Sequence, residues 1–197
     1  MKLVLASSNA GKLQEFHEMF ANAGFDLHAQ SEFGVTDVEE TGLTFIENAL
    51  LKARHAARVT GLPALGDDSG IVVDALGGAP GLYSARYAGV HGNADANIDK
   101  LLRELESVPD ELRTARFHCV LALLRHPDDP EPIVAEGSWR GCILPARRGN
   151  GGHGYDPVFL DPASGLSAAE MAPADKNRLS HRGLALAALK RRLPELL

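Results

Sequence analysis

The sequence predicts an α/β domain built on a mixed sheet, and two observations support that prediction. The chain opens with a strand, a loop and a helix, the unit from which parallel sheets are assembled. Further along, residues 117–124 and 133–139 have the pattern of two long strands in a hairpin, separated by a proline-rich turn at 127–132. A hairpin adds an antiparallel pair beside the strand–helix units, so we expect both kinds of pairing in one sheet.

The opening unit has a clear pattern. A strand is expected at residues 2–6, followed by a helix from about Lys12 to Gly24. The apolar face of this helix is formed by Leu13, Phe16 and Phe20.

A second helix has well-marked ends. It begins at Thr44, where the hydroxyl and the carboxylate of Glu47 can cap each other's amides, and it runs to Gly61. Two short strands are expected around Leu65 and at 71–73, followed by an irregular glycine-rich loop at 77–81. Two further helices are expected at 97–108 and at 179–193.

Length and composition exclude several classes of protein. The 197 residues contain no repeat, linker or low-complexity tract, so we expect one domain, residues 1–197. A net charge of -6 has the wrong sign for a protein that binds the phosphates of duplex nucleic acid. Apolar runs stay well below the roughly 18 residues of a membrane helix. The two cysteines lack metal-ligand spacing and favour a reducing compartment, so we expect a cytoplasmic protein that binds neither nucleic acid nor membrane.

The turn between the first strand and the first helix has the features of a phosphate-binding loop. Amides at a helix start attract anions, a glycine allows close approach, and a lysine adds a full charge. A capped helix start with a surface lysine is the equally open alternative. A Walker A loop is excluded by Ala6 and Leu13, which replace its first glycine and its magnesium-binding hydroxyl. The candidate phosphate-binding residues are Ser7, Ser8, Asn9, Ala10, Gly11 and Lys12.

Acidic residues suggest a metal site. Asp67 and Asp68 are adjacent and flanked by glycines at the expected end of a short strand, where a hard cation such as Mg²⁺ would relieve their repulsion. An ordinary turn is the alternative, because Asp, Ser and Gly are turn formers. Glu40 is a candidate further ligand, and Lys52 shares a helix face with Asn48. Charged residues further along this helix, Arg54 and His55, fit a solvated face better.

Two later segments have features of a nucleoside site. The glycine-rich stretch 149–157 contains His153 and Tyr155, whose rings could stack on a base, although a flexible loop is equally open. At the expected head of the last helix, Lys176, His181 and Arg182 are candidate contacts, with an ordinary basic surface as the alternative.

Taken in order, these motifs resemble the inosine triphosphate pyrophosphatase family, whose members hydrolyse nucleoside triphosphates with deaminated purines. The similarity spans essentially the whole chain. It rests on the segments SSNAGK, EETGLTFIENA, DDSG, LGGAPGLYSARY, GYDP and SHRG at residues 7–12, 39–49, 67–70, 76–87, 154–157 and 180–183.

The resemblance implies a fold, a reaction and roles for individual residues. The fold would be an elongated mixed sheet flanked by helices, with two lobes around a nucleotide cleft. The reaction would be Mg²⁺-dependent hydrolysis of dITP, ITP or XTP to the monophosphate and pyrophosphate by a homodimer. Asp68 would be catalytic base and metal ligand, Glu40 a second magnesium contact, and Lys12 and Lys52 phosphate contacts, with Lys52 assigned to the catalytic set. The nucleotide contacts would be Ser69, His153, Gly154, Tyr155, Asp156, Lys176, His181 and Arg182.

One residue departs from the family pattern, and two other functions stay open. His153 stands where many bacterial members of the family have Phe. Inosine and xanthine present an acceptor at position 6 where adenine has a donor, so donors such as His181 and Arg182 would favour them. The alternatives are a P-loop-like phosphotransferase and a nucleotide-sensing module without catalysis.

Overall fold

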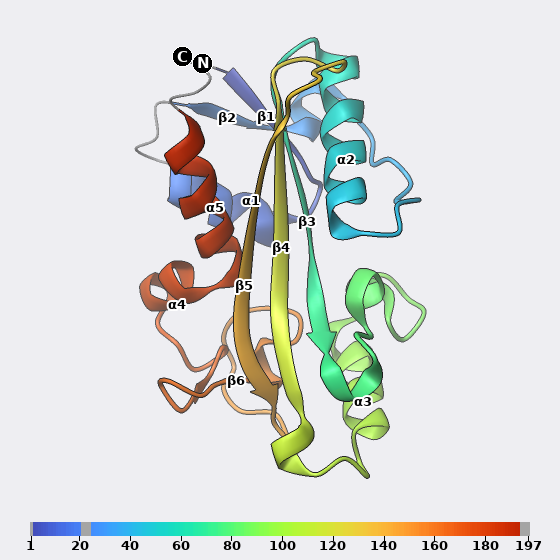
Figure 1. The fold of residues 1–197 in the computed structure, drawn as a ribbon, viewed down its shortest axis with the longest axis vertical. Helices are drawn as coiled ribbons and strands as arrows, with labels where there is room; N and C mark the ends of the chain where they lie inside the picture. Colours follow the sequence, from blue (N-terminus) through green and yellow to red (C-terminus); the bar gives the residue numbers. More distant parts are fainter. Residues whose placement is uncertain (1, 21–24, 194–197) are drawn as a thin grey trace. The chain divides into compact units, whose positions relative to one another are not determined.

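The computed structural model describes residues 2–20 and 25–193, and these contain a seven-stranded sheet (Figure 1). The strand order is β2-β1-β3-β4-β5-β6-β7. Strand β1 pairs in parallel with β2 and β3, whereas β6 pairs antiparallel with β5 and β7. The mixed sheet and the α/β class are therefore confirmed. The strands are β1 Lys2–Ala6, β2 Asp26–Ala29, β3 Ala64–Val73, β4 Thr114–Leu124, β5 Ile133–Ile143, β6 Phe159–Asp161 and β7 Leu166–Ser167.

Five α-helices lie in the described part of the chain, and none of them is long and apolar enough to cross a membrane. The long second helix has the predicted ends: Thr44 accepts a hydrogen bond from the Glu47 amide, and Gly61 adopts the left-handed conformation with φ 67°. The helices are α1 Ala10–Phe20, α2 Phe45–Thr60, α3 Ala94–Glu104, α4 Pro173–Leu179 and α5 His181–Arg192.

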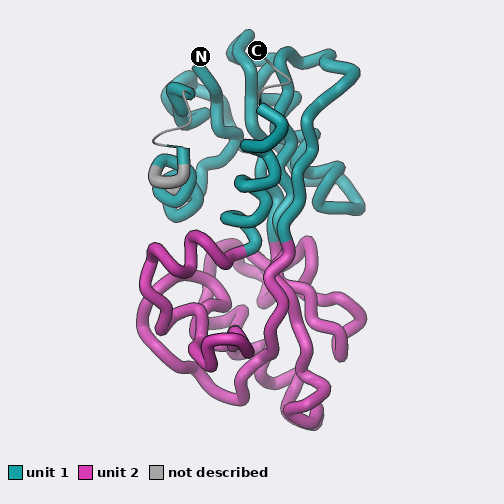
Figure 2. The backbone as a smooth tube through the Cα atoms, turned by 60° about the vertical axis from the view of Figure 1, so that its left-hand side comes forward, with its two compact units in different colours: residues 1–69, 119–137, 181–197 teal, residues 70–118, 138–180 magenta. Residues whose placement is uncertain are grey.

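The chain forms two compact units (Figure 2). Unit 1 comprises residues 1–69, 119–137 and 181–197, and unit 2 comprises residues 70–118 and 138–180. The unit boundaries fall within β3, β4 and β5. The expectation of one domain stays a prediction, and each unit has its own core.

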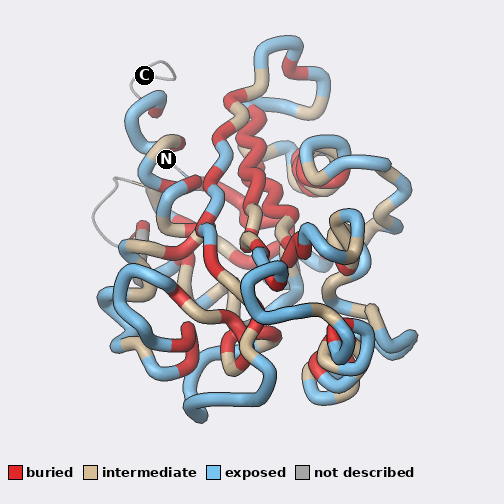
Figure 3. The backbone as a smooth tube through the Cα atoms, turned by 60° about the horizontal axis from the view of Figure 1, so that its bottom comes forward, coloured by how far each residue is buried: buried red, intermediate tan, exposed pale blue. Residues whose placement is uncertain are grey.

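The core of unit 1 follows the two-residue period of its strands. Leu3 and Leu5 pack with Phe16 of α1 and Leu186 of α5. Val4, which lies between them in β1, points to the other face and packs with alanines of α2. Buried residues gather along the strands, whereas the connecting loops are largely exposed (Figure 3).

The core of unit 2 is aromatic. The Phe159 ring lies 4.5 Å from that of Phe117 and 4.9 Å from that of Trp139, measured between ring centroids. The indole of Trp139 donates a 3.0 Å hydrogen bond to Asp161, so its polar atom is satisfied inside the core. Helix α3 packs on this cluster through Ile98 and Leu101, and Leu105 at its C-terminal cap joins them.

The structure corrects the expected course of the chain around the acidic pair. The two short strands expected around Leu65 and at 71–73 are one strand, β3, which continues through Asp67 and Asp68. Turn-forming residue types are overridden here because β3 lies between β1 and β4 in the sheet.

Other boundaries also differ from expectation. The helix expected at 97–108 is α3 (Ala94–Glu104), and the strands expected at 117–124 and 133–139 extend to Thr114–Leu124 and Ile133–Ile143. Helix α1 begins two residues earlier, at Ala10, and its expected end at Gly24 lies outside the described residues. The loop expected to be irregular at 77–81 is flanked by two 3-10 turns, Asp74–Leu76 and Gly81–Arg86. The last helix is interrupted at Ser180, whose extended backbone (ψ 156°) separates α4 from α5.

Candidate active site

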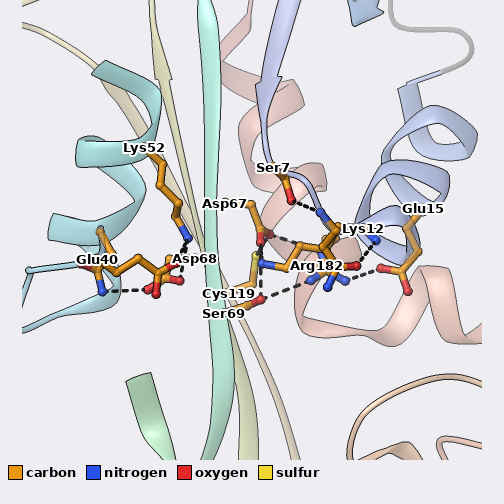
Figure 4. Close-up of polar contacts among 12 residues, drawn as sticks. Ser7, Lys12, Glu15, Glu40, Lys52, Asp67, Asp68, Ser69, Cys119 and Arg182 are labelled. Carbon is orange, nitrogen blue, oxygen red and sulfur yellow. Dashed lines mark hydrogen bonds and ion pairs between the residues drawn. The ribbon is translucent and has the colours of Figure 1, made fainter. Parts of the chain in front are cut away.

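Asp67 and Asp68 point to opposite faces of the sheet, because neighbouring residues of a strand alternate. Figure 4 shows Glu40 and Lys52 on one side of β3, and Lys12 and Arg182 on the other. The adjacent carboxylates are therefore not one shared acidic site. Each has its own cationic partners within unit 1.

The Asp68 side brings together the residues predicted from the second helix. Lys52 Nζ donates to Asp68 Oδ1 and to Glu40 Oε1, at 2.9 Å in both cases. Asn48 Nδ2 donates to Asp68 Oδ2 at 3.3 Å. Asn48 and Lys52 are four residues apart on α2, so the predicted shared face is confirmed.

Close packing of α2 on the sheet makes this contact possible. Gly66 lies two residues before Asp68 on the same face of β3, and a Cβ atom there would be 2.0 Å from the Ala49 carbonyl oxygen. The Asn48 side chain also accepts a 2.8 Å hydrogen bond from the Gly42 amide. Helix α2 is thereby tied both to β3 and to the loop that carries Glu40.

On the other face, the Asp67 carboxylate is completely buried and receives several donors. Its side chain has 0% exposure. The Lys12 ammonium binds Oδ1, and Arg182 Nε and Cys119 Sγ donate to Oδ2 at 3.2 and 3.3 Å. The acidic pair and the Ser7–Lys12 turn therefore meet through Asp67 rather than Asp68.

Arg182 is itself part of this buried cluster. Its guanidinium binds Glu15 and donates to Ser69 Oγ at 3.2 Å, in addition to Asp67. Helix α5 approaches β5 closely at Gly137, where a Cβ atom would be 2.1 Å from the His181 carbonyl oxygen. This approach places Arg182, with 4% exposure, inside unit 1.

The Ser7–Lys12 turn is organised by its own side chains. Asn9 Oδ1 accepts from the Lys12 amide at 3.1 Å and Ser7 Oγ accepts from the Asn9 amide at 3.2 Å, so α1 has the capped start expected from the alternative interpretation. Ser8 is exposed, and its hydroxyl donates to Asp37 at 2.5 Å. Ala10 and Gly11 lie in the first turn of α1. A capped start and a phosphate loop are compatible here, because the Lys12 side chain remains 18% exposed.

The two carboxylates have pKa values shifted in opposite directions. Burial raises the pKa of Asp67, but Lys12 and Arg182 outweigh it and hold that pKa well below its usual range. Burial also raises the pKa of Asp68; Lys52 opposes the shift, Glu40 adds to it, and the net pKa is raised. Such a divergence is typical of acid–base sites, with Asp68 as the group suited to accept a proton.

Lys52 and Cys119 also have shifted pKa values. Burial lowers the pKa of Lys52, but the charges of Asp68 and Glu40 outweigh it, so the pKa is raised and the ammonium stays charged. Burial and the Asp67 carboxylate raise the pKa of Cys119 well above its usual value. Cys119 is therefore a protonated thiol that donates to Asp67.

The residues predicted from the glycine-rich loop belong to unit 2 and have different environments. His153 is exposed and Gly154 is half-buried. Asp156 is 4% exposed, accepts from the His153 amide at 2.7 Å and pairs with Lys176 Nζ at 2.5 Å. This pair joins the loop to α4.

Tyr155 is not available as a stacking surface. It is 5% exposed, packs in the core of unit 2 and donates a 2.9 Å hydrogen bond to the Ser84 carbonyl oxygen. Of the two rings proposed for stacking, His153 alone is exposed. Lys176 also lies on α4 rather than at the head of the last helix, whereas the half-buried His181 begins α5.

Sequence reasoning missed Glu15, Cys119 and Asp37. Glu15 follows Lys12 by three residues on α1, and this spacing alone places the two on one helix face. Cys119 and Asp37 had no local signal, because their partners Asp67 and Ser8 are 52 and 29 residues away.

Glu40 and Asp68 are the residues that could hold a metal ion. Within residues 2–20 and 25–193 no group of three or more His, Cys, Asp or Glu side chains is arranged for a metal. Mg²⁺ in phosphate-transfer sites needs only about one or two protein carboxylates, with the other ligands from phosphate and water. One oxygen of Glu40 and one oxygen of Asp68 each lie 2.9 Å from Lys52 Nζ, so the two carboxylates are close together and the pair fits that requirement.

Comparison with known proteins decides the family. A model of the Ham1 family matches residues 3–192. The chain belongs to the Ham1 family. A relative in Xanthomonas campestris pv. campestris (strain 8004), named dITP/XTP pyrophosphatase, is 64% identical over 191 residues, 97% of this chain and 96% of the relative. A relative of the same name in Thioalkalivibrio sulfidiphilus (strain HL-EbGR7) is 60% identical over 193 residues, 98% of each.

A solved Ham1 structure agrees with the fold. The structure of a HAM1 protein from Coxiella burnetii matches with a TM-score of 0.92 and 48% sequence identity, covering 99% of both chains. Membership of the Ham1 family confirms the resemblance to inosine triphosphate pyrophosphatases that was drawn from the six sequence segments.

Proposed function

We propose that this Ham1 protein hydrolyses deaminated purine nucleoside triphosphates (dITP, ITP and XTP) to the monophosphate and pyrophosphate, and so removes them from the nucleotide pool. The observation that carries the proposal is the Asp68 side of β3, where a carboxylate of raised pKa is hydrogen-bonded to a charged lysine beside Glu40. The names of relatives at 60–64% identity support the same reaction.

Asp68 is the proton acceptor of the proposed reaction. It accepts a proton from the water that attacks the α-phosphorus, and its raised pKa makes it a better acceptor than an ordinary carboxylate. Asn48 and Lys52 hold its two oxygens and so fix its orientation. Attack at the α-phosphorus releases pyrophosphate, in line with the name pyrophosphatase that the relatives carry.

The lysines neutralise the charge of the triphosphate. Lys52 stays protonated between two carboxylates, and Lys12 presents a partly exposed ammonium at the start of α1. Stabilising charge that develops on the leaving group is most of what phosphoryl transfer asks of a protein. Mg²⁺ at Glu40 and Asp68 would, when bound, supply further charge neutralisation and make a bound water more acidic.

Residues of unit 2 are proposed to recognise the nucleoside. Exposed His153 offers a ring for stacking, and the Asp156–Lys176 pair holds the loop that carries it. In unit 1, His181 and Ser69 are proposed as nucleotide contacts from the family resemblance. Donors in these positions would favour a purine with an acceptor oxygen at position 6.

The assembly and location also belong to this proposal. We infer a homodimer, in line with the family resemblance, and a cytoplasmic location, in line with Cys119 and Cys142 being free thiols. Light scattering on the purified protein tests the first inference, with a mass of two chains as the expected result. A single-chain mass at micromolar concentration would contradict it.

The direct test is a panel of triphosphates incubated with the purified protein and Mg²⁺, with products separated by ion-exchange chromatography. We expect ITP, dITP and XTP to yield monophosphate and inorganic pyrophosphate, with ATP and GTP left nearly intact. A nucleoside diphosphate with a phosphorylated acceptor would instead indicate a phosphotransferase. Tight binding without turnover would indicate a nucleotide sensor.

A further inference from the structure

We propose that Asp67 is a positioning residue, which holds the Lys12 ammonium in place for the phosphates of the substrate. The inference rests on the proposed function, because it assigns a role within the same triphosphate site. The adjacent carboxylates then have different roles, since Asp68 takes part in the reaction, whereas Asp67 acts through Lys12 on the opposite face of β3.

The Asp67 oxygens are already bound by the protein. Oδ1 binds the Lys12 ammonium, and Oδ2 accepts from Arg182 and Cys119. The side chain has no exposed surface, so substrate cannot reach it directly. An effect of Asp67 on the reaction must therefore pass through a neighbour. Two of its neighbours are partly exposed: Ser69, whose hydroxyl donates to Oδ1 at a long 3.5 Å, and Lys12, whose side chain is 18% exposed and is the charged one of the two.

Asp67 also links distant segments of the chain. Asp67 joins β3 to residues of α1, β4 and α5, which are 55, 52 and 115 positions away in the sequence. Glu15 closes the network by binding Arg182 from the same face of α1 that carries Lys12. The first two turns of α1 are thus fixed at two points, through Lys12 to Asp67 and through Glu15 to Arg182.

The buried charges around Asp67 are costly to desolvate. Burying charged groups carries a desolvation penalty of several kcal/mol per ion, and apolar residues of similar size often stabilise a protein as well or better. Four charged side chains, those of Glu15, Lys12, Asp67 and Arg182, lie in this cluster beside an aliphatic and aromatic core. Such a cluster is explained by the precise placement of a charge, because a shift of about 1 Å in a reacting geometry can lower the rate about 100-fold.

The experiment is a double-mutant cycle on ITP hydrolysis with the full chain, comparing wild type, Asp67→Asn, Lys12→Met and the double variant. We expect Asp67→Asn to lower kcat/KM about 100-fold in the wild-type background but less than about threefold when Lys12 is already Met. The inhibition constant of inorganic pyrophosphate, which probes the phosphate contacts without turnover, should rise at least about tenfold in Asp67→Asn.

The matched control is Asp129→Asn. Asp129 is also a buried aspartate of unit 1 paired with an arginine, Arg125, but it closes the β4–β5 turn. This variant should lose stability while keeping kcat/KM and pyrophosphate inhibition at wild-type values. Equal effects of Asp67→Asn in both Lys12 backgrounds, or wild-type kinetics in Asp67→Asn, would overturn the positioning role. A wild-type protein that does not hydrolyse ITP would instead overturn the proposed function.

Lys12→Arg tests the same contact if Asp67→Asn does not fold. Arginine keeps the charge but presents it with a different geometry. If position matters, kcat/KM falls at least about tenfold while the melting temperature stays within a few degrees of wild type. Wild-type kcat/KM in Lys12→Arg would show that charge alone suffices, and would refute the proposal.

Discussion

At the scale of single residues, strand alternation decides the roles of two adjacent aspartates. Asp67 and Asp68 differ by one position, yet one is surrounded by Lys12 and Arg182 and the other by Lys52 and Glu40. Burial acts on both carboxyls in the same direction, so the difference in pKa comes from the charges on each face: Lys12 and Arg182 at Asp67, but Lys52 opposed by the Glu40 carboxylate at Asp68.

The role of Asp68 gives the first prediction. Asp68→Asn should lower kcat/KM by about 10²–10⁴-fold, the usual contribution of a general base. The melting temperature should change little: the raised pKa indicates that the fold disfavours the Asp68 charge, and Lys52 keeps its Glu40 partner when that charge is removed. Steady-state kinetics and thermal melts monitored by circular dichroism check both parts. Retained turnover would remove Asp68 from the reaction, whatever the melting temperature.

The metal-binding role of Glu40 gives the second prediction. Glu40→Gln should raise the Mg²⁺ concentration for half-maximal rate by about tenfold or more. Its neighbour Glu39 is exposed and serves as the control, so Glu39→Gln should leave the magnesium dependence unchanged. Titration of the rate with MgCl₂ provides the measurement. Identical curves for the two variants would argue against a ligand at position 40.

Much of the site could be predicted from residue types and spacing. Lys52 and Asn48 were placed on one face by the helix period, and both bind Asp68. Burial, in contrast, could not be read from the sequence: Tyr155 looked like a stacking ring but fills the core of unit 2, since its hydroxyl finds a partner in the Ser84 carbonyl.

At the scale of elements, two glycines let helices approach the sheet and carry side chains to the acidic pair. Gly66 allows α2 to contact β3, and Gly137 allows α5 to contact β5. These approaches bring Lys52 and Arg182 within hydrogen-bond distance of Asp68 and Asp67. The sequence shows the glycines, but close approach depends on which helix covers which strand, and that is a tertiary property.

Gly66 gives the third prediction. Gly66→Ala should destabilise the protein by about 3 kcal/mol or more, because the added methyl group meets backbone that cannot move aside. Gly34→Ala is the control: its φ of 69° is strained for alanine, but the space around it is open, so the cost should be about 1–2 kcal/mol. Urea unfolding measures both values. Equal costs would mean that α2 does not press on β3 at this point.

Local signals predicted elements well where they act within a few residues. The Thr44 and Glu47 caps and the Gly61 end of α2 are of this kind. Strand β3 was predicted as two pieces because Asp67, Asp68, Ser69 and Gly70 are turn formers, whereas pairing with β1 and the position beside β4 keep this segment extended.

At the scale of the whole molecule, ion-paired carboxyls should control stability in acid. The pKa values of Asp67 and Asp129 are lowered in the fold by Lys12 and Arg182 and by Arg125, respectively, although burial opposes the shift in both. Their contribution is therefore fully present above the unfolded-state pKa, near 3.8, and is lost as pH falls below it.

The fourth prediction compares melting temperatures between pH 7 and pH 3. Asp67→Asn should melt lower than wild type at pH 7 but should lose less on acidification, because it lacks one of the linked carboxyls. Each unit of lost pKa shift corresponds to about 1.4 kcal/mol, or about 3–6 °C for a chain of this length. Parallel curves for the two proteins would mean that Asp67 does not contribute to acid sensitivity.

The most direct test of the account is hydrolysis of ITP in water enriched in ¹⁸O, followed by mass spectrometry of both products. A water activated by Asp68 and directed at the α-phosphorus places one ¹⁸O atom in the inosine monophosphate and none in the pyrophosphate. Label in the pyrophosphate, or release of labelled inorganic phosphate, would contradict the arrangement of Asp68, Lys52 and Lys12 around the triphosphate that is proposed for this protein.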